Sequence, residues 1–144
     1  LLDETGDAIR QRGHEFGTVS KRPRRCGWLD IPMLRYATRI NGVTSLAVTK
    51  LDVLTGIHKL KICTGYRYRG KMLREFPAEI SQLPDCKPVY ETLMGWVVED
   101  ISDTKRRKDL PRQARAYLSY IEKQLNIPVR YISVGAERKA LIKK

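Results

Sequence analysis

The stretch from residue 110 to residue 132 constrains the fold more than any other part of the chain. Pro111 opens it, and apolar residues then recur at the spacing of one helical face. They are Ala114, Tyr117, Leu118, Ile121 and Leu125. Asn126 ends the helix, Pro128 prevents its continuation, and residues 129–132 follow as a short buried strand. A helix that runs directly into a buried strand predicts helices packed on a sheet.

A second helix and strand precede this pair. Asp30 is the expected N-cap of a helix over residues 31–40, and Pro32 lies in its first turn, where the missing N–H costs nothing. The Asn-Gly pair at residues 41–42 ends the helix. Residues 43–48 follow as a buried strand. The order of helix and strand is therefore repeated.

The remaining elements are shorter or more exposed. Residues 3–12 have the composition of a short helix that Gly13 ends. Apolar and basic side chains alternate over residues 58–68, which predicts a half-buried strand with a turn at residues 69–71. Residues 77–88 hold three prolines and are expected to form an ordered loop. We predict an α/β fold with mixed α+β elements in a single segment.

The charge of the chain predicts an anionic partner. It has 144 residues, with 28 Lys and Arg against 16 Asp and Glu, which gives a formal net charge of +12. Such an excess favours nucleic acid, a nucleotide, an acidic metabolite or a membrane surface. No apolar run is long enough to cross a bilayer and no signal peptide is visible, so membrane association is not expected.

The cysteine and histidine patterns argue against disulfide bonds and against a metal site. Cys26, Cys63 and Cys86 are widely spaced and odd in number, so we expect reduced thiols in a cytoplasmic protein. His14 and His58 lie far apart in the sequence and belong to no metal-binding motif. A metal site built by this chain is therefore not expected.

Positive charge is densest in one short loop, residues 17–27. The loop begins and ends with glycine, and four of the five residues from 21 to 25 are cationic, beside the hydroxyls of Thr18 and Ser20. Guanidinium forks, hydroxyls and backbone N–H groups suit a ligand with several carboxylates or phosphates. Nucleic-acid binders usually interleave aromatic and basic residues. Pro23 stiffens this loop, which favours a compact anion; a solvated basic loop is the alternative.

Two segments that follow predicted strands carry groups suited to a purine base. Residues 49–52 end at Asp52, whose two acceptor oxygens match the ring N–H and exocyclic amine of guanine, a donor pair that adenine lacks. Lys50 would lay its aliphatic stem across the base. Residues 133–135 end at Gly135, which permits close approach to a flat ring. Ligands gather at strand ends in α/β sheets, although each segment alone is also compatible with an ordinary loop or turn.

Six blocks in this order resemble the adenylosuccinate synthetase family over essentially the whole chain. They are residues 13–18 (GHEFGT), 22–30 (RPRRCGWLD), 46–54 (LAVTKLDVL), 90–93 (YETL), 95–96 (GW) and 132–135 (ISVG). The resemblance implies a GTP-dependent ligase of purine (AMP) biosynthesis that joins IMP and L-aspartate with Mg²⁺, as a cytoplasmic homodimer. This chain would be the C-terminal third of that larger α/β nucleotide-binding enzyme.

The resemblance also implies roles for particular residues. The loop that closes on aspartate would comprise Thr18, Val19, Ser20, Lys21, Arg22, Pro23 and Arg24. Arg22 would reach the IMP ribose and the substrate, while Arg24 would hold a substrate carboxylate and lie beside GTP. The guanine pocket would comprise Lys50, Leu51, Asp52, Ser133, Val134 and Gly135. These roles agree with the chemistry of the residues themselves.

The chain departs from the family pattern at a few positions. Lys21 stands where the family usually has Gly, which predicts a stiffer loop or a strained φ angle and a changed affinity for aspartate. Val19 replaces the usual Thr and removes one hydroxyl. Met94 and Ala136 stand where Pro is common, and we expect these changes to matter less.

The N-terminal phosphate loop of the family, with its catalytic Asp, and the His that assists phosphoryl transfer do not occur here. No GxxxxGK[ST] motif is present, and the first residue is Leu1 rather than Met, which suggests that something upstream is missing. No catalytic residue and no metal ligand is therefore assigned to this segment, and we expect it to be inactive alone. A stand-alone basic module that binds nucleic acid is the alternative function.

Overall fold

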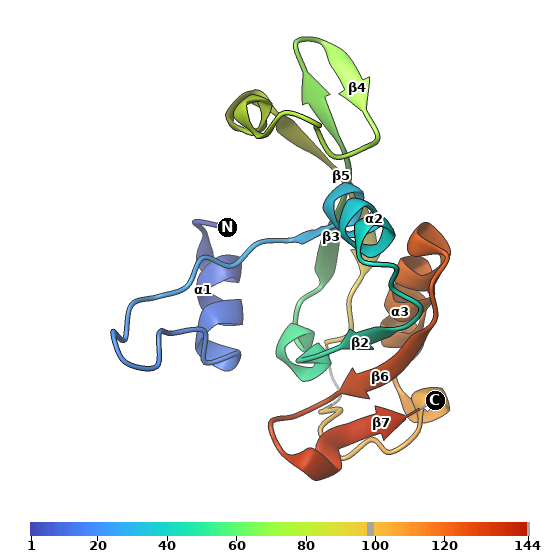
Figure 1. Ribbon diagram of the computed structural model, residues 1–144. Helices are drawn as coiled ribbons and strands as arrows, with labels where there is room; N and C mark the ends of the chain where they lie inside the picture. The colour runs from blue at the N-terminus through green and yellow to red at the C-terminus, as the bar shows by residue number, and fades with distance from the viewer. Residues whose placement is uncertain (98–99, 144) are drawn as a thin grey trace.

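The computed structural model describes residues 1–97 and 100–143. These residues form two sheets, and the first is built around one long strand (Figure 1). This strand, β3 (Lys59–Tyr68), pairs in parallel with β1 (Leu29–Asp30). It pairs antiparallel with β4 (Lys71–Leu73) and β5 (Lys87–Met94). Leu60 and Ile62 of β3 are buried while Lys59, Lys61 and Arg67 are exposed, so the predicted alternation is confirmed.

The second sheet has the order β2-β6-β7. β2 (Leu46–Val48) is parallel to β6 (Val129–Ser133), and β7 (Leu141–Lys143) is antiparallel to β6. A parallel pair requires a long crossover between its strands, and here the crossover contains β3, β5 and a helix. The predicted α/β fold with mixed α+β elements is confirmed.

Three α-helices occur within the described residues, and the sequence predicts each of them. They are α1 (Glu4–Arg12), α2 (Ile31–Ile40) and α3 (Arg112–Leu125). The Oδ1 atom of Asp30 accepts a hydrogen bond from the N–H of Met33 at 2.9 Å, which makes it the N-cap of α2 as predicted. The five apolar residues predicted to form one face of α3 are all buried. None of the helices among residues 1–97 and 100–143 is long and apolar enough to cross a membrane.

One apolar core joins α3 to both sheets. Leu60 and Ile62 of β3, Leu118 of α3, and Ile132 of β6 are each at most 1% exposed and belong to it. Trp96 and Tyr117 pack edge to face with ring centroids 6.3 Å apart. In Figure 1, α1 and the loop that follows it lie to one side of this core, and the hairpin of β3 and β4 extends away from it.

Some expected boundaries differ from those observed. The strand expected over residues 43–48 is confined to β2, and a 3₁₀ turn, η1 (Leu51–Leu54), follows it. A second 3₁₀ turn, η2 (Ile80–Asp85), occupies the proline-rich segment that we expected to be an ordered loop. β5 was not predicted, because most of its residues are exposed and carry no apolar alternation. Its pairing with β3 alone defines it.

Candidate functional site

The two segments expected to contact a purine base leave the second sheet side by side. In the parallel pair of β2 and β6, Val48 lies opposite Ile132. Both strands therefore end at the same edge of the sheet, where η1 follows β2 and residues 133–135 follow β6. The structure thus brings together two groups of residues that lie some eighty positions apart in the sequence. This is the edge at which ligands bind in α/β sheets.

Asp52 presents an unpaired acceptor in this region. Its Oδ1 atom is buried and has no hydrogen-bond partner, the one such side-chain atom found within residues 1–97 and 100–143. An unsatisfied buried acceptor costs about 1–3 kcal/mol. An external N–H donor would remove that cost, so this oxygen has the chemistry of a ligand contact.

The neighbours of Asp52 are held firmly. Leu51 is 1% exposed and anchors η1 in the core. Lys50 adopts a left-handed backbone with φ of 59°, and its Nζ atom donates to the carbonyl oxygen of Gly13 at 2.7 Å. The sharp turn at Lys50 connects the end of β2 to η1 and directs its ammonium group toward the end of α1.

The segment after β6 forms a closed turn. The Ser133 hydroxyl donates to the carbonyl oxygen of Gly135 at 2.8 Å, and the N–H of Val134 donates to the carbonyl oxygen of Ala140 at 2.9 Å. Val134 is fully buried. A Cβ atom on Gly135 would lie 3.1 Å from the Cβ of Ala140, so a larger residue would have to displace its neighbour.

The basic loop is a narrow hairpin outside the sheets. Phe16 and Pro23 form an isolated antiparallel bridge, and the N–H of Gly17 donates to the carbonyl oxygen of Arg22 at 2.9 Å. Residues 18–25 are all exposed. The Arg22 guanidinium has no partner within the described part of the chain. This loop therefore offers its cations to solvent or to a ligand.

Lys21 has the backbone geometry expected of a glycine. Its φ angle is 55°, in the left-handed region that costs a residue with a side chain about 1–2 kcal/mol. The N–H of Lys21 donates to the carbonyl oxygen of Gly17 at 2.9 Å, which closes the hairpin. The strained φ angle predicted for this position is confirmed. The effect on aspartate binding stays a prediction.

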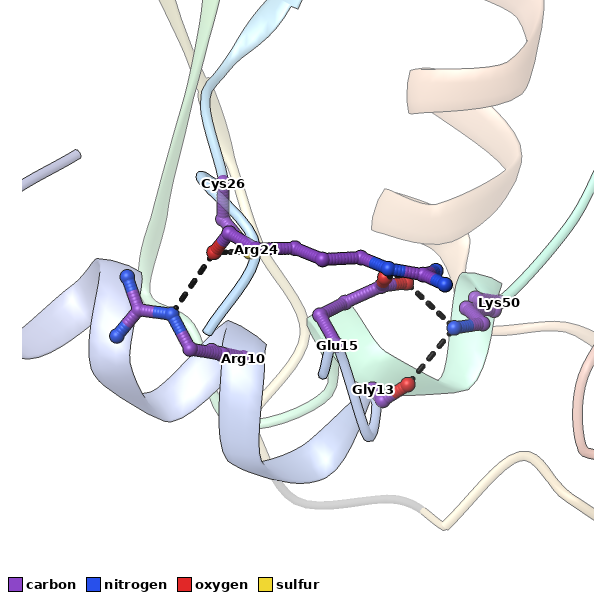
Figure 2. A network of polar contacts seen from close by, with 6 residues as sticks. All are labelled: Arg10, Gly13, Glu15, Arg24, Cys26 and Lys50. Atoms are coloured by element: carbon purple, nitrogen blue, oxygen red, sulfur yellow. Dashed lines mark hydrogen bonds and ion pairs between the residues drawn. The ribbon is translucent and has the colours of Figure 1, made fainter. Parts of the chain in front are cut away.

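Glu15 connects the basic loop with the strand-end segment (Figure 2). Its Oε1 atom accepts a hydrogen bond from Lys50 Nζ at 2.5 Å, and its Oε2 atom accepts one from Arg24 Nη1 at 3.1 Å. The Lys50 contact, and then the Arg24 contact, lower the pKa of the Glu15 carboxyl against the opposing effect of burial. Sequence reasoning did not single out Glu15, because its partners come from distant segments.

A hollow of about 520 Å³ lies beside this bridge, within the range of ligand pockets. Its polar wall includes Glu15, Arg24 and Lys50, and its apolar wall includes Tyr117 and Ile121. Of the residues predicted to bind ligands, only Arg24, Lys50 and Leu51 line this hollow, while Arg22, Asp52, Ser133, Val134 and Gly135 do not. The structure thus places Arg24 and Lys50 in one site and leaves Arg22 in the exposed loop.

Comparisons with known proteins place this geometry in a family. The family model for adenylosuccinate synthetase matches residues 1–142. The chain belongs to the adenylosuccinate synthetase family. It is 54% identical over 138 residues to the adenylosuccinate synthetase of Carboxydothermus hydrogenoformans, covering 96% of this chain and 32% of that protein. It is 50% identical over 144 residues to the adenylosuccinate synthetase of Halothermothrix orenii, covering 100% of this chain and 33% of that protein.

A solved structure of an adenylosuccinate synthetase agrees with the fold. The fully ligated enzyme from Plasmodium falciparum superposes with a TM-score of 0.94 at 42% identity, covering 100% of this chain and 35% of that one. The chain thus spans about a third of the length of the synthetases that it matches.

Proposed function

We propose that this chain is the C-terminal third of an adenylosuccinate synthetase, the cytoplasmic and homodimeric ligase that joins IMP and L-aspartate with GTP. Its own part in the reaction is to recognise guanine and to supply the loop that closes on aspartate. The observation that carries the proposal is the buried, unpaired Oδ1 atom of Asp52 in a chain of this family. Guanine has two adjacent N–H donors that can bond to this carboxylate, whereas adenine has no such donor pair.

Each part of the proposed site has a distinct task. Asp52 would accept from the ring N–H and exocyclic amine of guanine, while the turn at residues 133–135 would border the base. Arg24 would bind a carboxylate of aspartate and lie beside GTP, and Arg22, whose guanidinium has no partner in the described chain, would reach the IMP ribose. Arginine is suited to these roles because its planar fork bonds a carboxylate at two points.

In the proposed enzyme, the chemistry of phosphoryl transfer lies outside these residues. Within residues 1–97 and 100–143, no group of three or more His, Cys, Asp or Glu side chains could hold a metal ion. We propose that the Mg²⁺ that the family uses is bound mainly by other parts of the enzyme, and no metal-dependent step is assigned to this chain. We predict that these 144 residues alone give no turnover in a coupled assay with IMP, aspartate and GTP.

The activity can be tested in a chimera. This chain replaces the matching third of the Carboxydothermus hydrogenoformans enzyme, to which it is 54% identical. We expect the chimera to form adenylosuccinate, and we expect Asp52→Ala to raise its KM for GTP by at least about fivefold, since one correct base contact is worth about 1–3 kcal/mol.

Asp85→Ala is the matched control, because Asp85 is an exposed aspartate in η2. It should leave the KM for GTP unchanged. Unaltered GTP kinetics in an active Asp52→Ala chimera would contradict the assignment of Asp52. The alternative of a stand-alone module that binds nucleic acid has no support from the comparisons.

A further inference from the structure

Glu15 is the one acidic side chain in the described hollow that bonds to both halves of the proposed site. Its two carboxylate oxygens accept from Lys50 Nζ at 2.5 Å and from Arg24 Nη1 at 3.1 Å. Lys50 belongs to the proposed guanine pocket, and Arg24 to the proposed aspartate loop. The carboxylate therefore holds one cation from each half at the same time (Figure 2).

The backbone fixes Glu15 in this place. Its N–H donates to the carbonyl oxygen of Arg10 at 2.9 Å, and its carbonyl oxygen accepts from the N–H of Arg24 at 2.9 Å. The Arg10 Nε atom also donates to the carbonyl oxygen of Arg24 at 2.9 Å. The end of α1 and the base of the loop thus form one frame that fixes the main chain of Glu15 between its two cationic partners.

The Glu15 side chain is less exposed than either of its partners. Its side chain is 23% exposed, against 50% for Lys50 and 57% for Arg24. An isolated, exposed pair contributes little because solvent screens it and both side chains lose freedom. Here the acceptor is pre-positioned and shared, and Lys50 is also fixed by the carbonyl oxygen of Gly13 at 2.7 Å.

Resting on the function proposed above, we propose that Glu15 is a positioning residue that couples guanine binding to aspartate binding. A base packed on the Lys50 stem holds the ammonium on Glu15, and Glu15 in turn holds Arg24 ready for the aspartate carboxylate. Occupation of one half therefore raises affinity at the other. By linkage the effect on binding is mutual, and couplings of this kind are typically about 5–150-fold.

The coupling is measured in the active chimera as a ratio of two KM values for aspartate. The numerator is the KM for aspartate at a GTP concentration about tenfold below the KM for GTP. The denominator is the KM for aspartate at a GTP concentration about tenfold above the KM for GTP. We expect this ratio to be at least about fivefold in the parent protein. In Glu15→Gln, which keeps the shape and removes the charge, it should fall toward one, with kcat at saturation changed less than the ratio.

Two further variants keep the test decisive. Lys50→Met breaks the bridge from its other end, and combining it with Glu15→Gln should reduce the ratio no further than either change alone. Asp109→Asn is the control, because it removes the exposed pair with Arg106 at 2.6 Å and should leave the ratio at the parent value.

The outcomes separate this inference from the function on which it rests. An active chimera whose ratio is the same in the parent and in Glu15→Gln overturns the coupling and leaves the synthetase function standing. A parent chimera that is folded but forms no adenylosuccinate contradicts the proposed function itself. A ratio that falls in Glu15→Gln and in Lys50→Met alike supports the coupling.

Discussion

The basic loop, residues 17–27, and the strand ends of the second sheet are stabilised by different forces. Residues 18–25 of the loop are all exposed, with Val19 at 94%, and hydrogen bonds of the main chain hold its shape. At the strand ends, Leu51, Ile132 and Val134 are at most 1% exposed and belong to the apolar core. The core holds the proposed acceptor for guanine rigidly, whereas the loop offers its cations on a frame with little apolar packing.

This difference suits the two ligands of the proposed function, guanine and aspartate. A flat base is recognised by a fixed edge, so its acceptor gains from a rigid setting. A loop that closes on a small dicarboxylate has to open and close, and segments with few buried contacts have the lowest local stability. Glu15 joins the two regions because its carboxylate bonds to both Arg24 and Lys50. Arg24 therefore stays beside Lys50, while residues 18–23 of the loop remain free to move.

The largest effect should come from a buried glycine, Gly95, which directly follows β5. A Cβ atom there would lie 1.8 Å from the carbonyl oxygen of Ile57, and backbone cannot yield as a side-chain tip can. We expect Gly95→Ala to lower the free energy of unfolding by about 3 kcal/mol or more. Gly27→Ala, whose added Cβ meets nothing within 4 Å, should be nearly silent. Equal losses in urea unfolding would contradict the contrast between core and loop.

The second effect concerns ligand binding by the loop and not stability. Arg24 is 57% exposed at its side chain, so Arg24→Leu should leave the unfolding midpoint almost unchanged. We expect it to raise the KM for aspartate by about 10–100-fold in the active chimera, since a charge-assisted bond contributes about 1.5–3 kcal/mol. If the KM for GTP rises instead and that for aspartate stays constant, the role of the loop has to be reassigned.

Local signals explain which parts of the fold the sequence predicts. The cap at Asp30, the stop at Asn126 and the apolar face of α3 each depend on residues within a few positions, so they could be placed without coordinates. β5 could not, because its residues alternate only weakly and its existence depends on pairing with β3. The resemblance to a family supplied the candidate residues of the site.

What the sequence could not provide is contact between distant segments. The approach of Glu15 to Lys50 spans 35 positions, and no periodicity encodes it. The unpaired oxygen of Asp52 is likewise a property of burial and not of spacing. Arg24 and Lys50 lie around one hollow and Arg22 lies outside it, because the loop has the shape of a hairpin.

A smaller effect should appear in the pH dependence of folding stability, which distinguishes a buried tyrosine of the core from an exposed one. Burial raises the pKa of Tyr117, which is 7% exposed in the core, to about 12 from an ordinary value of 10.0. Above pH 10 the unfolded chain loses this proton and the folded protein retains it, so stability falls as pH rises. At pH 11 this difference amounts to about 1.4 kcal/mol, and Tyr117→Phe should recover it.

The test compares urea unfolding at pH 8 and pH 11. Tyr117→Phe should be close to the parent at the lower pH, because the Tyr117 hydroxyl has no hydrogen bond within the described residues. Tyr131→Phe, a change at a 43% exposed site, is the control and should gain much less at the higher pH. A variant at position 117 that loses stability with pH as steeply as the parent would contradict the assignment.

The smallest effect should come from the strained residue in the loop, Lys21. Its φ angle of 55° costs a residue with a side chain about 1–2 kcal/mol, and Lys21→Gly removes that cost. Glycine also loosens the unfolded chain, which takes back about 0.4–1 kcal/mol. The net gain in the free energy of unfolding should therefore be about 0.6–1 kcal/mol. Val19→Gly, at a position without a positive φ angle, has the entropic loss alone and should destabilise. Opposite signs for these two loop variants, measured by urea unfolding, are the expected result. A loss of stability in both variants would contradict the energetic cost assigned to the φ angle of Lys21.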